Sequence, residues 1–306
     1  MPAKLAIHVP THAVAIHVLA DGASVTLGRA PENDCVLAHD SVSRRHARIR
    51  NDGARWIVED LGSKNGVRVD GSRVENAELA ASQWLAIGDV FCEFERVAPD
   101  AVAHLNARAA HRRQSSQLWI DRIATSDSVD TLMETLLRGI VEIAECRRGF
   151  LLVMDASGAL RVRACRGMDE ADLGRAAFSG SRSAVDRAIL ERRPVYLSDR
   201  RDHDWLNDQA SVVARGIRAL AALPLVGESR LLGVAYADTD DEAKVFTELD
   251  ADLLEAFAGR ASAALAAAEI DAKLAQMESS LGSAAHWTSG THAAPESHRV
   301  ARGPRG

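Results

Sequence analysis

The sequence has few cysteines, and none of them stands in the spacing that a metal site or a disulfide framework needs. Its 306 residues contain four cysteines, which are scattered and form no CxxC pair. Isolated cysteines of this kind are typical of small buried side chains in a reducing compartment. The sequence therefore predicts no metal centre and no disulfide, and we expect a cytoplasmic protein.

Long apolar runs are also missing. No stretch approaches the roughly 20 apolar residues that a membrane-spanning helix needs, and the first residues lack the pattern of a secretory leader. Long basic runs are absent, and the formal net charge is -6. These absences argue against a membrane protein and against a general binder of nucleic acid, so we expect neither a membrane nor a nucleic acid as a partner.

Familiar catalytic signatures are missing as well. The sequence contains no glycine-rich phosphate loop, no HExxH pair and no serine–histidine–aspartate order. We therefore expect that the protein is not an enzyme.

Short strand patterns fill the first third of the chain. Between positions 5 and 97, short apolar runs alternate with polar residues, and turn signals such as Asn51-Asp52-Gly53 and Asp70-Gly71 separate them. Period-two patterning with frequent turns is typical of two packed antiparallel sheets. The sequence predicts an N-terminal all-β sandwich over residues 1–97.

Three short motifs occur in this segment in a fixed order, each at the point where a strand pattern gives way to a loop. They are Gly28-Arg29, Ser43-Arg44-Arg45-His46 and Gly62-Ser63-Lys64-Asn65-Gly66. Because each motif follows or precedes a strand, the three loops could converge on one small cationic patch. Such a patch suits a phosphate group carried by an extended peptide.

The residue types in the motifs fit that chemistry. The guanidinium of Arg29 can fork onto two phosphate oxygens, and such charge-assisted hydrogen bonds are the strong ones. The Ser43 hydroxyl can donate to a third oxygen, while Arg44 and Lys64 add positive potential. The amide of Asn65 carries both donors and an acceptor, which suits it to hold a peptide backbone.

With these motifs, residues 4–97 resemble a forkhead-associated (FHA) domain, which reads phosphothreonine. The resemblance implies that Arg29, Ser43, Arg44 and Lys64 bind the phosphate and that Asn65 binds the peptide main chain. The family often has threonine at the position of Lys64, so we expect a stronger and more salt-sensitive attraction for phosphate here.

The resemblance also implies supporting residues around this site. His46 corresponds to a buried histidine that holds the Ser43 loop, and Gly28 and Gly66 support the loop conformations. Two other interpretations stay open. The motif residues could be ordinary turn residues of a sandwich, and an FHA fold can also dock unphosphorylated partners.

The sequence changes character after Pro99. Residues 98–114 are polar and helix-prone, which predicts a helical linker. Two helical patterns, further strands and a long helix from Thr247 follow, and they predict an α+β domain over residues 115–278. Residues 279–306 are rich in serine, glycine, alanine and histidine, so we expect a disordered tail.

The segments 193–199, 217–220, 232–236 and 246–250 resemble those of a GAF domain, a small-molecule-sensing relative of PAS domains. The resemblance implies an α+β fold with an antiparallel sheet and an unidentified small-molecule ligand, and no known cofactor. The signature of cyclic-nucleotide binders is incomplete, because Ala251 stands where those domains have glutamate.

The order FHA then GAF resembles the front ends of bacterial signalling regulators. We interpret the chain as a cytoplasmic adaptor in a Ser/Thr kinase pathway that binds a phosphothreonine-bearing protein, with the GAF domain for sensing or dimerisation. The alternative is a GAF-based small-molecule sensor whose FHA domain is a phospho-independent scaffold. In the final helix, Leu249, Leu253 and Phe257 lie near one stripe, which could pack in a homodimer or on the chain's own sheet.

Overall fold

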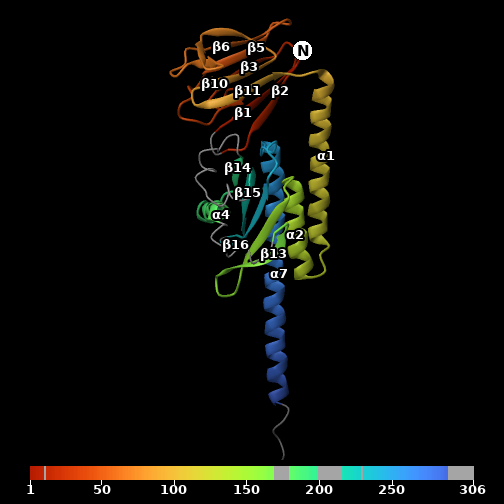
Figure 1. The fold of residues 1–306 in the computed structure, drawn as a ribbon. Helices are drawn as coiled ribbons and strands as arrows, with labels where there is room; N and C mark the ends of the chain where they lie inside the picture. Colours follow the sequence, from red (N-terminus) through yellow and green to blue (C-terminus); the bar gives the residue numbers. More distant parts are fainter. Residues whose placement is uncertain (10–11, 169–178, 199–215, 229, 289–306) are drawn as a thin grey trace, which may run out of the picture. The chain divides into compact units, whose positions relative to one another are not determined.

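The computed structural model describes residues 1–9, 12–168, 179–198, 216–228 and 230–288. One compact unit comprises Met1–Ala264, and a second begins at Leu265. The first unit contains an N-terminal β-sandwich, two helices and a five-stranded antiparallel sheet flanked by helices (Figure 1).

The N-terminal sandwich consists of two sheets, as the strand patterns predict. The first sheet has the order β2 (Ala15–Leu19), β1 (Ala3–His8), β11 (Val90–Arg96), β10 (Ser82–Ile87), β7 (Val67–Val69) and β8 (Ser72–Val74). The second has the order β4 (Cys35–Val36), β3 (Ser24–Gly28), β5 (Ala47–Asn51), β6 (Trp56–Asp60) and β9 (Asn76–Leu79).

Alternation along the strands forms the core of the sandwich. In β5, for example, Ala47, Ile49 and Asn51 are buried, while the residues between them are half-buried. The ring of Trp56 packs edge-on against Phe94 from the other sheet at 5.7 Å between centroids. Burying such aromatic and aliphatic side chains between two sheets is the main source of stability in a sandwich.

Helix α1 (Pro99–Ala124) follows the sandwich and has proline in its first turn, where the ring costs no hydrogen bond. The helix does not end at 114, where we expected the linker to stop. It continues because Ser115–Ala124 supplies no helix breaker, and Trp119 and Ile123 there are buried. Helix α2 (Val129–Ile143) then begins after Ser128, whose side chain accepts a hydrogen bond from the Thr131 N–H.

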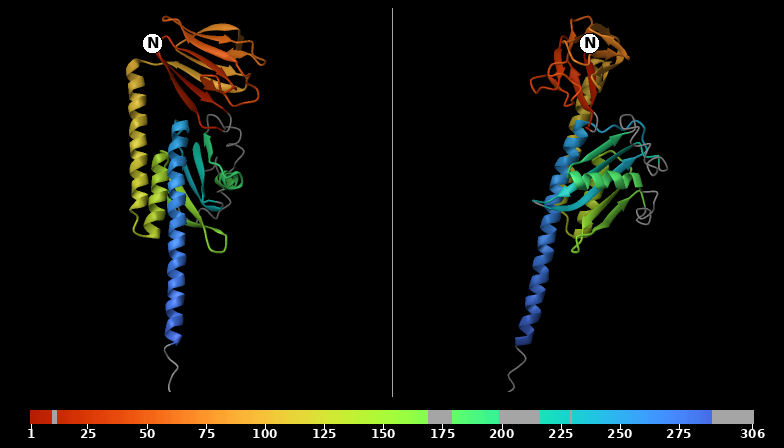
Figure 2. Two further views of the ribbon diagram at one scale, coloured as in Figure 1. Left: turned by 180° about the vertical axis from the view of Figure 1, so that it is seen from behind. Right: turned by 90° about the vertical axis from the view of Figure 1, so that its left-hand side faces the viewer.

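The C-terminal part of the chain forms a third sheet, whose five strands are all antiparallel to their neighbours. Its order is β13 (Leu160–Arg166), β12 (Arg148–Met154), β16 (Leu231–Thr239), β15 (Ala219–Val226) and β14 (Val195–Ser198). Helix α4 (Ser179–Glu191) lies on one face of this sheet, and α2 and α7 lie on the other (Figures 1 and 2). The α+β fold with an antiparallel sheet is therefore confirmed.

Helix α7 (Glu248–Thr288) begins with a capping box. The Asp250 carboxylate accepts from the Thr247 N–H at 2.6 Å, and the Asp250 N–H donates to Thr247 Oγ1 at 3.3 Å. The helix passes residue 279, where we expected the disordered tail to begin. Between 279 and 288 the sequence has no proline and one glycine, Gly282, so the segment offers little to stop the helix. The rest of that tail, 289–306, lies outside the described residues.

Candidate functional site

Three loops of the sandwich meet, and these are the loops that carry the three motifs. The Arg29 N–H donates to the Ser43 carbonyl at 3.0 Å, and the Ala30 N–H donates to the Arg44 carbonyl at 3.2 Å. The Lys64 N–H donates to Ser43 Oγ at 3.0 Å. Backbone and hydroxyl contacts therefore bring Arg29, Ser43, Arg44 and Lys64 together.

Ser43 lies at the centre of this arrangement. Its Oγ accepts the Lys64 N–H, so the hydroxyl hydrogen remains available as a donor to a further acceptor. The side chain is half-buried, which restricts the directions in which it can donate. The geometry thus offers one oriented hydroxyl donor beside several cations.

The cations around Ser43 have no acidic partner among the described residues. Arg29, Arg44 and Lys64 are exposed. Across the described ranges, none of these three side chains forms an ion pair with a carboxylate. Their charges are therefore not neutralised locally, and an incoming anion would meet positive potential from all three loops.

Asn65 has a structural contact as well as an available acceptor. Its Nδ2 donates to the Ser41 carbonyl at 2.7 Å, which ties the loop after β6 to the loop before β5. No hydrogen bond within the described part of the chain uses Asn65 Oδ1. That oxygen can accept from a peptide N–H, although one donor of the amide is already used.

His46 is fully buried beneath the loops. Its Nδ1 accepts from the Ser43 N–H at 3.1 Å, so its Nε2 carries the hydrogen and donates to the Gly66 carbonyl at 3.1 Å. Burial lowers the pKa of His46, although the hydrogen bond to Gly66 acts in the opposite direction. The neutral imidazole therefore connects the second motif to the third.

Two glycines permit close approach of backbone segments. A Cβ on Gly28 would collide with the Arg44 carbonyl oxygen and would lie 2.7 Å from Asn33 Nδ2. Gly66 has a φ of 77°, and a Cβ there would meet Arg73 Nε at 2.6 Å. Both positions therefore favour glycine, for space at Gly28 and for conformation at Gly66, where the Arg73 side chain could move aside but the positive φ would remain.

Sequence reasoning missed two residues that hold these loops. Asn33 is buried, and its Nδ2 donates to the carbonyls of Ala30 and Arg44 at 2.8 and 2.7 Å. The Ser41 carbonyl accepts a hydrogen bond from Asn65 Nδ2, and Ser41 Oγ accepts one from the Asp89 N–H at 2.8 Å. Neither residue lies inside a motif, so their roles depend on contacts between distant segments.

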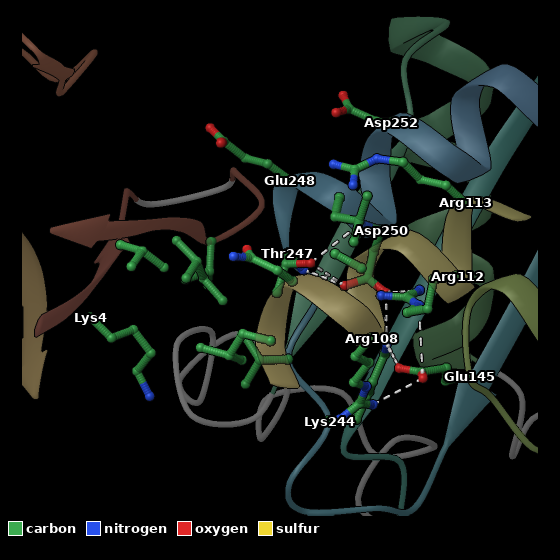
Figure 3. Close-up of a pocket in the computed structure, with 18 of the residues that line it drawn as sticks. Lys4, Arg108, Arg112, Arg113, Glu145, Lys244, Thr247, Glu248, Asp250 and Asp252 are labelled. Carbon is green, nitrogen blue, oxygen red and sulfur yellow. Dashed lines mark hydrogen bonds and ion pairs between the residues drawn. The ribbon is translucent and has the colours of Figure 1, made fainter. Parts of the chain in front are cut away.

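A second polar cluster lies between α1 and the start of α7 (Figure 3). The buried Asp250 carboxylate is 2.8 Å from both Arg112 and Lys244. Glu145 pairs with Lys244 at 3.3 Å and with Arg108 at 3.0 Å. Burial alone would raise the pKa of Asp250, but Lys244 and Arg112 outweigh it and hold that pKa below its usual value. Every member of the cluster has an opposite charge beside it, so these charges neutralise one another locally.

Comparison with known families matches two separate regions of the chain. The FHA domain family matches residues 25–92, and the GAF domain family matches residues 126–266. The chain carries an FHA domain followed by a GAF domain. The FHA match includes all three motif loops, and the GAF match includes the five-stranded sheet with α2 and α4.

Curated FHA proteins and regulators are similar to part of this chain. FhaB of Mycolicibacterium smegmatis is 47% identical over 53 residues, 17% of this chain and 34% of FhaB. The glycogen accumulation regulator GarA of the same species is 40% identical over 70 residues, 23% of this chain and 44% of GarA. The transcriptional regulatory protein EmbR of Mycobacterium bovis is 42% identical over 55 residues, 18% of this chain and 14% of EmbR. The chain thus spans less than half of each relative.

Solved structures of FHA domains are also similar to part of this chain. The FHA domain of CT664 from Chlamydia trachomatis is 32% identical, with 32% of this chain and all of that chain covered and a TM-score of 0.30. Mycobacterium tuberculosis EmbR, solved in complex with a low affinity phosphopeptide, is 29% identical over 31% of this chain and 25% of that chain, with a TM-score of 0.27. No helix among the described residues is long and apolar enough to cross a membrane.

Proposed function

We propose that this protein is a signalling adaptor whose FHA domain binds a phosphothreonine-bearing partner of a Ser/Thr kinase pathway. The observation that carries the proposal is the hydrogen bond from the Lys64 N–H to Ser43 Oγ at 3.0 Å. It orients one hydroxyl donor between cations that have no acidic partner in the described structure. A phosphate monoester offers that site one to two negative charges and three acceptor oxygens.

Each site residue has a distinct role in this proposal. Arg29 forks onto two phosphate oxygens, and Ser43 donates its hydroxyl to the third. Arg44 and Lys64 contribute charge from two further loops, so binding weakens as salt screens them. Asn65 Oδ1 accepts from the peptide backbone while its Nδ2 keeps Ser41 in place.

The relatives support this assignment of ligand class. Mycobacterium tuberculosis EmbR has been solved with a low affinity phosphopeptide, and this chain is 42% identical to EmbR of Mycobacterium bovis over 55 residues. The chain shares only part of the length of EmbR, so the transcriptional role of EmbR is not transferred.

The GAF domain supplies the second half of the proposal. It senses a small molecule or mediates dimerisation, without catalysis and in the cytoplasm, where the kinase partner acts. The alternative function is a small-molecule sensor in which the FHA domain is a phospho-independent scaffold. The two functions differ in whether the FHA domain distinguishes a phosphorylated peptide from an unphosphorylated one.

A degenerate phosphothreonine peptide library tests the proposal. The full chain is titrated against the library and its unphosphorylated counterpart, and the same titration is repeated with Arg29→Ala. We expect binding that requires both the phosphate and Arg29, and the enriched peptides would define the partner motif. Binding that is indifferent to phosphate, or no binding at all, would refute the phosphothreonine reader and favour the scaffold.

A further inference from the structure

The part of α7 after Leu265 carries three large apolar side chains that are open to solvent. Ile270, Leu274 and Met277 are 58%, 53% and 62% exposed. Isolated exposed apolar residues are ordinary on protein surfaces. These three, however, succeed one another at steps of four and three along a single helix.

That spacing is the apolar repeat of a coiled coil. Ala267 precedes Ile270 by three residues and is also exposed, so positions 267, 270, 274 and 277 alternate between the a and d positions of a heptad. In the sequence alone, a further step of four reaches Leu281. A mean spacing of 3.5 residues keeps one seam facing a partner helix, whereas a helix that packs on a globular core needs no such period.

The seam differs from the face of α7 that the GAF domain buries. Leu254, Phe257 and Ala261 are buried in the first part of the helix. At about 3.6 residues per turn, Ala261 and Ile270 are separated by about half a turn around the helix axis. The packing of Phe257 against Gly139 of α2 therefore leaves the Ile270–Met277 seam without an apolar partner among the described residues.

We propose that this seam binds the same seam of a second copy of the chain, as a parallel and in-register coiled coil. The flanking charges indicate this occupant and this orientation. With Leu274 at a, Lys273 occupies g and Glu278 occupies e of the next heptad, and a parallel pair places Lys273 beside Glu278 of the second copy. An antiparallel pair would instead bring g positions together and place lysine near lysine.

The surrounding residues are compatible with this pairing. Lys273 is 65% exposed, and its only ion pair in the described structure is with Glu269 one turn earlier, at 3.1 Å. Such an exposed pair is worth little and can exchange or share its partner. Ala267 at the preceding a position has no bulk that would hold two helices apart.

This self-association specifies the dimerisation proposed for the GAF domain and rests on that part of the proposed function, but it does not depend on phosphopeptide binding by the FHA domain. The sequence pattern left open whether the stripe of Leu249, Leu253 and Phe257 packs in a homodimer or on the chain's own sheet, and Phe257 is buried against α2. The seam lies farther along the helix. An assembly with two FHA domains would bind a doubly phosphorylated partner more tightly than either domain alone.

Sedimentation of the full chain tests the proposal directly. Molar mass is measured between about 1 and about 100 μM, a range that brackets the affinity expected of a seam this short. The test variant is Leu274→Glu. The matched control is Leu190→Glu, which changes a leucine that is 85% exposed on α4 and lies outside the seam. Circular dichroism of both variants checks that they are folded.

We expect the wild type and Leu190→Glu to have masses of at least two chains and to become lighter on dilution. Leu274→Glu should raise the dissociation constant by at least about tenfold. Masses above two chains also support the proposal, because leucine at a with isoleucine at d is compatible with larger parallel bundles. A monomeric wild type, or an oligomer that Leu274→Glu leaves intact, would overturn it.

The orientation has its own test. Lys273→Glu should weaken the assembly by placing two acidic side chains side by side, and Lys273→Glu combined with Glu278→Lys should restore it. In addition, Leu274→Cys should form an intermolecular disulfide under mild oxidation, because equal positions face each other only in a parallel, in-register pair. Failure of both the rescue and the cross-link would overturn the parallel register.

Discussion

Replacing Gly28 by alanine should disturb the phosphate-binding loops of the FHA domain. A Cβ at this position collides with the Arg44 carbonyl oxygen, which accepts hydrogen bonds from the Ala30 N–H at 3.2 Å and from Asn33 Nδ2 at 2.7 Å. Relieving the collision requires the carbonyl to move and to weaken both bonds. At about 0.5–1.5 kcal/mol each, their loss costs about 1–3 kcal/mol.

The unfolded chain offsets part of this loss. Alanine restricts the unfolded chain more than glycine does, and this lower entropy stabilises the folded state by about 0.4–1 kcal/mol. We therefore expect Gly28→Ala to destabilise the FHA domain by about 1–2 kcal/mol. Because Arg44 moves with its carbonyl, phosphopeptide affinity should also fall.

Hydrogen–deuterium exchange is the suitable assay, because a protein with two domains has no single unfolding free energy. Peptides from residues 24–66 should exchange faster in Gly28→Ala, while those from the GAF domain should not change. Gly227→Ala is the matched control, since its nearest neighbour, Leu232, is at an ordinary 3.4 Å from the new Cβ. If Gly28→Ala kept the exchange pattern and the phosphopeptide affinity of this control, the close approach of the two loops would be refuted.

Three further predictions concern the buried polar groups and the packing of the helices. Folding lowers the pKa of His46, so the folded protein binds fewer protons there and stability falls as the pH drops below about 6.5. NMR titration of the His46 ring should follow the loss of protection at the Ser43 amide, and independence of the two would contradict this. Gly139→Ala should destabilise the GAF domain by about 1–3 kcal/mol, because its Cβ enters the buried ring of Phe257. Gly259→Ala meets nothing within 4 Å and should instead add up to about 1 kcal/mol, as hydrogen–deuterium exchange of peptides from the GAF domain would show. Asp250→Asn removes the buried carboxylate that Arg112 and Lys244 share, while Glu145 stays beside both cations. It should cost the GAF domain about 1.5–3 kcal/mol in the same assay, and a loss below about 1 kcal/mol would contradict the dependence of the two cations on Asp250.

The sequence predicted the site residues better than the contacts that hold them. Arg29, Ser43 and Lys64 stand in short motifs whose order is visible in the chain, and hydrogen bonds bring their loops together. Asn33 could not be recognised, because an asparagine in a turn usually bonds to its own neighbours. Its bond to the Arg44 carbonyl depends on how two distant loops fold against each other.

Element boundaries were predictable where packing and local propensity agree. The strand Ala219–Val226 is as expected, since a buried apolar run ends at a turn. Short strands such as β8 and β9 were not predicted, because their exposed polar residues resemble a loop. Helices α1 and α7 both continue beyond the residues at which we expected them to end, because weak helix formers do not stop a helix once it has begun.

The central claim is that Arg29 recognises phosphate through its forked guanidinium. Isothermal titration of a threonine-phosphorylated peptide into wild type, Arg29→Lys and Arg55→Lys tests this claim, because lysine keeps the charge and removes the fork. Arg55 is an exposed arginine in the β5–β6 hairpin, where it pairs with Asp52 at 3.3 Å, and it serves as the control. The account predicts that Arg29→Lys weakens binding by about tenfold or more while Arg55→Lys leaves it unchanged. Equal affinity of Arg29→Lys and wild type would contradict it.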